Sequence, residues 1–249
     1  MSGVSKNKRF IDTHLFSPAA SHFLEYGYYT NALPGTKSYY DYWDLEKQRC
    51  LYGYEVDGVS ITGFHYFYLN YCRMERAVEE IQPDGSTLNR RENSFPSFYD
   101  GDHEYFHAVD QARKEDKHLA VLKARRKGFS YKAAAMLVRN YYFQRGSRGY
   151  VFASQKEYLI GDGHTAWAQP RLRDREMHKQ SGYKKNINGA LVELGMKAQI
   201  IGVSLKDDPD KVRGKAGDLV FFEEAGSFPG LLKAWEVTMP TMRQGSKTL

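Results

Sequence analysis

Two short segments of this 249-residue chain carry side chains that could bind and hydrolyse a nucleotide. The first reads Leu122-Lys123-Ala124-Arg125-Arg126-Lys127-Gly128-Phe129-Ser130-Tyr131 and lies between an apolar, strand-like run and a long helical run. A strand, a glycine-containing turn and a helix N-terminus together present backbone N–H groups and a positive dipole end to an anion. The segment therefore predicts a phosphate-binding loop, and the alternative is a basic junction without a ligand.

The second segment lies about ninety residues downstream, where the apolar run Leu219-Val220-Phe221-Phe222 leads directly into Glu223 and Glu224. A buried strand of this kind delivers acids to the C-terminal edge of a parallel sheet, which is a Walker B pattern. The alternative is a pair of exposed acids that cap the next segment. The order and separation of the two segments suit one ATPase core.

The loop departs from the common pattern G-x-x-x-x-G-K-[ST], in which a lysine follows the second glycine. Phe129 takes the place of that lysine, Ser130 takes the hydroxyl place, and Lys123 replaces the first glycine. Because such a loop wraps around the phosphates, its two ends converge, and Lys123 can still reach the β- and γ-oxygens. Lys127 and Lys132 compete for this role, and Lys123 is favoured because the preceding strand would fix its position.

Phosphoryl transfer from ATP requires positioning and charge neutralisation more than covalent chemistry. We expect the Ser130 hydroxyl to bind Mg²⁺ and Glu223 to hold the metal directly or through water. Glu224 would orient the attacking water and partly deprotonate it. An arginine could stabilise the transition state, and the candidates are Arg125 and Arg126 in cis or Arg213 across subunits.

The net charge of +6 is concentrated around the loop. From Lys117 to Lys156 there are ten Lys or Arg and no Asp or Glu, so the rest of the chain carries 26 basic and 30 acidic residues, a net charge of −4. Concentrated positive charge is typical of surfaces that bind polyphosphate or a nucleic-acid backbone, although a solvated basic face is the simpler alternative.

Other features exclude several classes of protein. The sequence has neither an apolar run long enough to span a bilayer nor an apolar signal core, so we expect a soluble protein with no membrane partner. Cys50 and Cys72 are too few and too far apart for a metal knuckle, and buried reduced thiols are expected in place of structural zinc.

The elements expected around these motifs form three regions. Residues 1–36 predict an irregular arm, residues 37–97 a small accessory region, and residues 98–249 a P-loop ATPase core. Expected helices cover about 38–51, 65–71, 102–116, 130–144 and 155–179. Expected strands cover 54–61 as a hairpin, a pair around 83–85, and then 118–123, 150–153, 190–194, 199–203 and the run before Glu223. The predicted fold is α/β, with a parallel-rich sheet flanked by helices and a βαβ unit around the loop.

Four motifs in order resemble one known family. They are Lys-x-x-x-x-Gly-Phe-Ser at 123–130, Val-Arg-Gly at 212–214, Phe-Phe-Glu-Glu-Ala at 221–225 and the aromatic run at 63–70. Together they resemble the N-terminal ATPase half of the large terminase subunit of tailed bacteriophages, over roughly residues 35–249. The resemblance implies an ASCE-type P-loop ATPase that uses ATP and Mg²⁺ to translocate double-stranded DNA into a procapsid.

The resemblance also implies partners and site residues. The partners would be double-stranded DNA, a portal protein, a small terminase subunit and further copies in a ring, a pentamer, with a monomer in isolation. The location would be the host cytoplasm, at the portal vertex. The loop would contain Lys123 and Ser130, the Walker B acids would be Glu223 and Glu224, and Arg213 would be the finger. Adenine would contact one of Phe98, Tyr99 and Tyr105.

Two departures from the family are visible. Glu223 stands where an Asp is usual, and the chain stops before a nuclease domain, so we expect an ATPase without DNA cleavage. The alternatives are another P-loop translocase of nucleic acid, such as a helicase-like ATPase, or a non-hydrolysing DNA-binding module.

Overall fold

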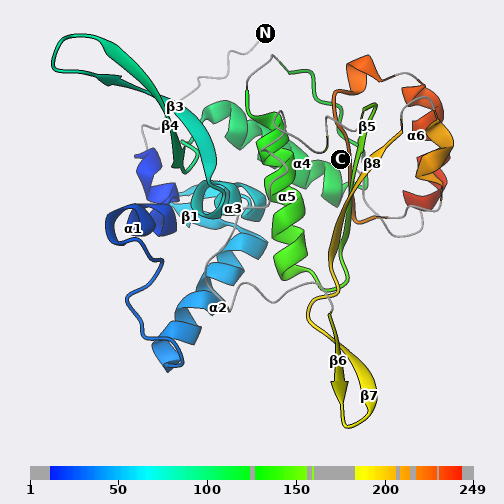
Figure 1. Cartoon of the computed structure of the whole chain (residues 1–249), viewed down its shortest axis with the longest axis horizontal. Helices are drawn as coiled ribbons and strands as arrows, with labels where there is room; N and C mark the ends of the chain where they lie inside the picture. Colours follow the sequence, from blue (N-terminus) through cyan, green and yellow to red (C-terminus); the bar gives the residue numbers. More distant parts are fainter. Residues whose placement is uncertain are drawn as a thin grey trace.

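The chain has an α/β fold in which a parallel sheet is flanked by helices. The computed structural model describes residues 12–123, 127–155, 159, 183–205, 208–213, 217–228 and 230–242. Helices of the N-terminal half form one layer, and the sheet follows in the C-terminal half (Figure 1). The α/β prediction is therefore confirmed.

The N-terminal layer is built around a buried aromatic helix. Its elements are the 3-10 helix η1 (Thr13–Phe16), α1 (Pro18–Tyr26), α2 (Lys37–Tyr52), β1 (Tyr54–Val56), β2 (Val59–Ile61) and α3 (Gly63–Tyr71). All nine residues of α3 are buried, as expected for an aromatic cluster of the core. A Cβ on Gly63 would lie 2.8 Å from the carbonyl oxygen of Leu51, so glycine allows α3 to approach α2 closely. Cys50 and Cys72 are both buried free thiols, as predicted.

The irregular arm expected over residues 1–36 is wrong in its described part, because η1 and α1 lie there. Pro18 marks a helix start instead of a break, since proline fits the first helical turn. The side-chain oxygen of Asn70 accepts hydrogen bonds from the N–H groups of Ala19 and Ala20 at 3.0 and 3.2 Å. This residue of α3 therefore binds the start of α1 from about fifty positions away in the sequence.

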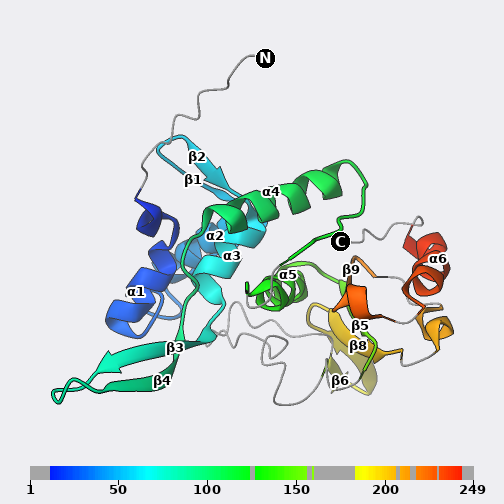
Figure 2. The same ribbon diagram turned by 90° about the horizontal axis from the view of Figure 1, so that it is seen from above.

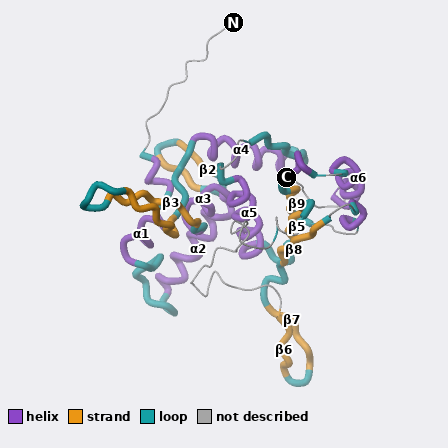
Figure 3. Tube along the Cα trace, turned by 45° about the horizontal axis from the view of Figure 1, so that its top comes forward, coloured by secondary structure: helices purple, strands orange, loops and turns teal. Residues whose placement is uncertain are grey.

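Two antiparallel hairpins extend from the body (Figure 3). The first joins β3 (Met74–Ile81) to β4 (Thr87–Ser94), with the predicted turn at 83–85 as its tip. The second joins β6 (Tyr183–Ile187) to β7 (Ala190–Leu194). The first hairpin confirms the strand pair expected around 83–85.

The parallel sheet contains β5 (Arg148–Ala153) between β8 (Gln199–Ser204) and β9 (Leu219–Phe222). The helices α5 (Phe129–Phe143) and α6 (Leu231–Met242) cover its two faces (Figure 2). Val151, Leu219 and Phe221 belong to the hydrophobic cluster on the α5 side, whereas Phe152 and Val220 belong to the cluster on the α6 side. This alternation is the period of two expected for strands covered on both faces.

A strand over 118–123 was predicted from its apolar residues and is absent. The segment between α4 (Asp100–Lys114) and the loop is irregular, with Leu122 fully exposed and Val121 42% exposed. Among the described residues, both edges of β5 already pair with β8 and β9, so the segment has no place beside the middle strand. The expected βαβ unit is therefore an irregular segment followed by α5 and β5. Most of the helix predicted over 155–179 lies outside the described residues.

A buried arginine of α5 contacts the end of α2. The Nε and Nη2 atoms of Arg139 donate hydrogen bonds to the carbonyl oxygens of Cys50 and Leu51 at 2.9 and 2.8 Å. The Arg139 guanidinium also lies over the Phe64 ring, 4.6 Å from its centroid. Cationic donors at a helix C-terminus bind carbonyls that lack a helical partner, so Arg139 ties α5 to α2.

Candidate functional site

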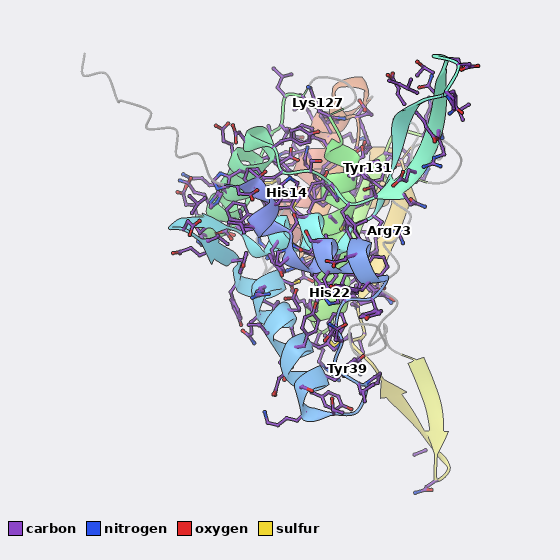
Figure 4. All side chains as sticks on the ribbon, turned by 90° about the vertical axis from the view of Figure 1, so that its left-hand side faces the viewer. His14, His22, Tyr39, Arg73, Lys127 and Tyr131 are labelled. Carbon is purple, nitrogen blue, oxygen red and sulfur yellow. The ribbon has the colours of Figure 1, made fainter. Side chains whose placement is uncertain are left out.

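The helix α5 begins at an uncapped turn. It starts at Phe129, one residue before the predicted start, and Gly128 precedes it with the left-handed angles φ 68° and ψ 19°. Its N-cap residue, Gly128, has no side chain to cap the helix, and the first turn contains no acidic residue. Figure 4 labels Lys127 just before α5 and Tyr131 within its first turn. The N–H groups and the dipole of this turn are therefore suited to an anion.

The hydroxyl of Ser130 meets the first acid after β9. Its Oγ donates a hydrogen bond to Oε1 of Glu223. Glu223 continues the pairing of β9, since its N–H donates to the carbonyl oxygen of Phe152 at 2.8 Å. Because side chains alternate between the two faces of a strand, Glu223 lies on the same face as Phe221, which is the α5 side of the sheet. Glu223 is 7% exposed. The sequence analysis expects both side chains to bind Mg²⁺, and the structure places them in direct contact with each other.

The second acid after β9 meets the lysine at the front of the loop. The Nζ of Lys123 lies 3.2 Å from Oε1 of Glu224. Glu224 has the left-handed angles φ 50° and ψ 44°, which are uncommon for a residue other than glycine. This turn ends the strand alternation, so both acids can contact the segments around the loop although they are adjacent in sequence.

Four predicted residues are therefore brought together at the C-terminal end of β9. Lys123 and Glu224 are separated by 101 positions in the sequence, and Ser130 and Glu223 by 93. The sequence predicted that a strand fixes Lys123, but that strand is absent, and the described contact of this lysine is with Glu224.

The other two lysines have different surroundings. The Lys132 ammonium is 2% exposed and lies 2.7 Å from Oδ1 of Asp102, while it also donates to the carbonyl oxygen of Lys127 at 2.7 Å. These bonds engage the Lys132 ammonium with a buried carboxylate and with a carbonyl of the predicted loop. The side chain of Lys127 is exposed.

The arginine candidates are less well placed. Arg213 follows the short 3-10 helix η4 (Pro209–Val212), and its Nε donates to Oδ1 of Asp210 at 2.9 Å. This hydrogen bond holds the pKa of the exposed Asp210 carboxyl below its ordinary value. Ala124, Arg125 and Arg126 lie outside the described residues.

The three aromatic candidates for adenine occupy different places. Phe98 stacks between Phe16 and His65, with ring centroids 5.1 Å from each, and so belongs to the core. Tyr99 is 61% exposed before α4. Tyr105 packs edge-on against Phe129 at 5.1 Å, at the start of α5. Burial raises the pKa of the Tyr105 phenol, and the negative charges of Asp102 and Glu223 raise it further.

Asp102 is the residue of this region that sequence reasoning missed. An acid in the first turn of a helix is common, because it is favoured by the helix dipole. Its position in α4 therefore gave no signal of its contact with Lys132, thirty residues later in the sequence.

The described part of the chain contains no group of three or more His, Cys, Asp or Glu that could hold a metal ion. None of the helices described there is long and apolar enough to cross a bilayer.

No protein-family model and no curated protein matches the sequence. Among solved structures, the chain is similar to the ATPase domain of the large terminase of Thermus phage P74-26. The identity is 20%, the match covers 50% of this chain and 55% of that chain, and the TM-score is 0.38. A mutant of the same domain matches with the same identity and coverage and a TM-score of 0.37. The chain thus spans about half the length of these solved terminase ATPase domains, which belong to the family that the motifs resemble.

Proposed function

We propose that this chain is a magnesium-dependent ATPase whose site is the start of α5 and the end of β9. One observation carries the proposal: the Ser130 hydroxyl and the Lys123 ammonium each contact one of two adjacent carboxylates, Glu223 and Glu224, beside an uncapped helix N-terminus. A hydroxyl, an ammonium, paired acids and the N–H groups at a helix start are the parts that phosphoryl transfer requires.

Each residue has a role in this proposal. The N–H groups at the start of α5 and the Lys123 ammonium bind the phosphates. The Ser130 hydroxyl and the Glu223 carboxylate hold Mg²⁺, which neutralises charge on the phosphates when it is bound. Two oxygen ligands suit this ion, because Mg²⁺ keeps several waters and uses few protein carboxylates. Glu224 orients the attacking water and accepts its proton.

The contact between Lys123 and Glu224 implies that phosphate binding precedes activation of the attacking water. In the free protein each side chain partly neutralises the other, at 3.2 Å. A phosphate that binds Lys123 competes with Glu224 for the ammonium. The carboxylate is then released to bind water, so nucleotide binding and activation of the base are coupled.

We propose further that the ATPase belongs to a motor that packages viral DNA. The ordered motifs of the terminase family and the basic segment 117–156 support this step. The motor would act on double-stranded DNA as a ring at the portal vertex of a procapsid in the host cytoplasm, with portal protein and small terminase subunit as partners. Arg125, Arg126 or Arg213 would provide the finger. The same proposal includes the predicted boundaries of the regions of the chain, which fall after residues 36 and 97 and place the ATPase core at residues 98–249.

Calorimetry with Mg-ATP tests the site directly. We expect the wild type to bind and Lys123→Ala to lose most of the affinity, while Lys127→Ala tests the competing lysine. Lys117→Ala is the matched control, because Lys117 is also paired with a glutamate, Glu115, at 2.7 Å.

Equal affinities in all four proteins would remove Lys123 from the site. If none of them binds Mg-ATP while the wild type still binds duplex DNA with strong salt dependence, the non-hydrolysing DNA-binding module becomes the better account.

A further inference from the structure

A buried ion pair lies directly behind the candidate phosphate-binding loop. The side chains of Lys132 and Asp102 are 2% and 11% exposed, and their charged atoms are 2.7 Å apart. Charged side chains are almost never buried unless they are paired, and a buried pair is weak evidence for stability by itself. The surroundings of this pair therefore indicate what else it does.

Lys132 holds the residues that end the loop. Its ammonium donates to the carbonyl oxygen of Lys127 at 2.7 Å and lies over the Phe129 ring, 4.2 Å from the centroid. Its backbone N–H donates to the carbonyl oxygen of Gly128 at 3.1 Å. One residue thus contacts all three positions over which the chain turns into α5.

Asp102 makes this position of Lys132 possible. A cation is unfavourable in the first turns of a helix, whereas an anion is favourable there. Lys132 lies four residues into α5 and Asp102 lies in the first turn of α4. The carboxylate therefore suits its own helix and neutralises a lysine that would otherwise disfavour the start of α5.

The loop needs such a support because no strand precedes it. The segment before Lys123 is irregular, and Leu122 is fully exposed. The sequence analysis expects a strand over residues 118–123 to fix the front of the loop. In the structure the end of the loop, at Lys127, is instead held by Lys132, which is paired with Asp102 of α4.

We propose that Lys132 and Asp102 are positioning residues for the phosphate-binding loop. They hold residues 127–129 in the turn that directs the first N–H groups of α5 at a phosphate, and neither side chain touches the nucleotide. This inference rests on the proposed function, and it names two residues that the motif pattern leaves without a role.

The test compares Lys132→Met and Asp102→Asn with the wild type in two measurements. The first is hydrogen exchange of peptides covering residues 127–135 without nucleotide. The second is the Mg-ATP dissociation constant, measured at a temperature at which thermal unfolding curves show each variant to be folded. Arg49→Met is the control, because it breaks an ion pair elsewhere, between the half-buried Arg49 and the buried Glu46 of α2 at 2.6 Å.

We expect faster exchange over 127–135 and an affinity for Mg-ATP reduced by about tenfold to a hundredfold in Lys132→Met, since small misplacements of binding groups have effects of that order. Asp102→Asn should show the same changes to a smaller extent. The double variant should not be much worse than Lys132→Met, because the two residues act as one unit. Arg49→Met should change neither measurement.

Folded Lys132→Met with wild-type exchange and wild-type affinity would overturn the inference. If Lys132→Met does not fold, Asp102→Asn decides it by the same two measurements. If the wild type itself does not bind Mg-ATP, the proposed function fails, and the exchange measurement alone then decides whether the pair orders the turn.

Discussion

Replacing Glu224 by Gln should have opposite effects on nucleotide binding and on hydrolysis. The carboxylate contacts the Lys123 ammonium at 3.2 Å, and the two side chains are 49% and 29% exposed. A pair this exposed contributes about 0.2–1 kcal/mol. Binding of a phosphate must displace that contact, so its removal should tighten Mg-ATP binding by about 1.4- to 5-fold, with RT ≈ 0.59 kcal/mol.

Hydrolysis should fall by at least about a hundredfold in the same variant, because an amide cannot accept the proton of the attacking water. Calorimetry measures the affinity, and phosphate release under single-turnover conditions measures the chemical step. The ion pair is also screened by salt, so the gain in affinity should shrink as the ionic strength rises.

Lys123→Ala provides the matched background for this experiment. Loss of a charge-assisted hydrogen bond, about 1.5–3 kcal/mol, should weaken Mg-ATP binding by about 10- to 150-fold. With the ammonium gone, adding Glu224→Gln should no longer raise the affinity. The reasoning would be refuted by a Glu224→Gln protein that binds more weakly than the wild type, or by one that hydrolyses ATP at the wild-type rate.

Three predictions concern the stability of the scaffold. Burial, with smaller contributions from His103, His107 and Lys132, lowers the pKa of His65 from 6.5 to about 3. The unfolded state therefore takes up a proton below pH 6.5 that the folded state does not, and the unfolding free energy should fall by up to about 1.36 kcal/mol per pH unit as the pH decreases towards 3. Urea unfolding at several pH values should show that His65→Phe removes this part of the slope, and an unchanged slope would contradict the assignment. Gly63→Ala should lower the free energy of unfolding by about 1–3 kcal/mol, because the added Cβ would collide with the backbone of α2. Gly101→Ala in α4 is the control, and it should raise that free energy by up to about 1 kcal/mol, because its Cβ would meet open space. Thermal unfolding that ranks the two variants the other way would reject the packing argument. Asn70→Ala removes the side chain that binds the start of α1 and should lower the denaturant midpoint by an amount equivalent to about 1–2 kcal/mol, with an unchanged midpoint as the contrary result.

The parts of the fold that were predictable are those with a local signal. The run Leu219–Phe222 is apolar at every position, and it forms a strand covered on both faces. The run 118–123 is also partly apolar, but it is irregular and pairs with none of the three strands of the described sheet. An apolar run by itself does not indicate whether it will join a sheet. The sequence therefore predicted β9 correctly and the strand before the loop wrongly.

In the site, too, the sequence indicates residues within a motif but not the contacts between distant elements. Spacing identified Ser130, Glu223 and Glu224, and the structure brings them together. The sequence analysis favours Lys123 over Lys127 and Lys132, and it could not display that Lys132 is buried against Asp102. Pairs that join distant helices depend on tertiary packing, which a single sequence does not display.

The contact of Arg139 with α2 gives α5 a second task besides carrying the loop. Gly128 and Arg139 are eleven residues apart, about 16 Å along a helix. If a bound phosphate displaced the N-terminus of α5, the helix would carry Arg139 with it. The displacement would then change the hydrogen bonds of Arg139 to the carbonyl oxygens of Cys50 and Leu51. Through Arg139, the helix that begins at the candidate site is therefore joined by hydrogen bonds to the C-terminal end of α2.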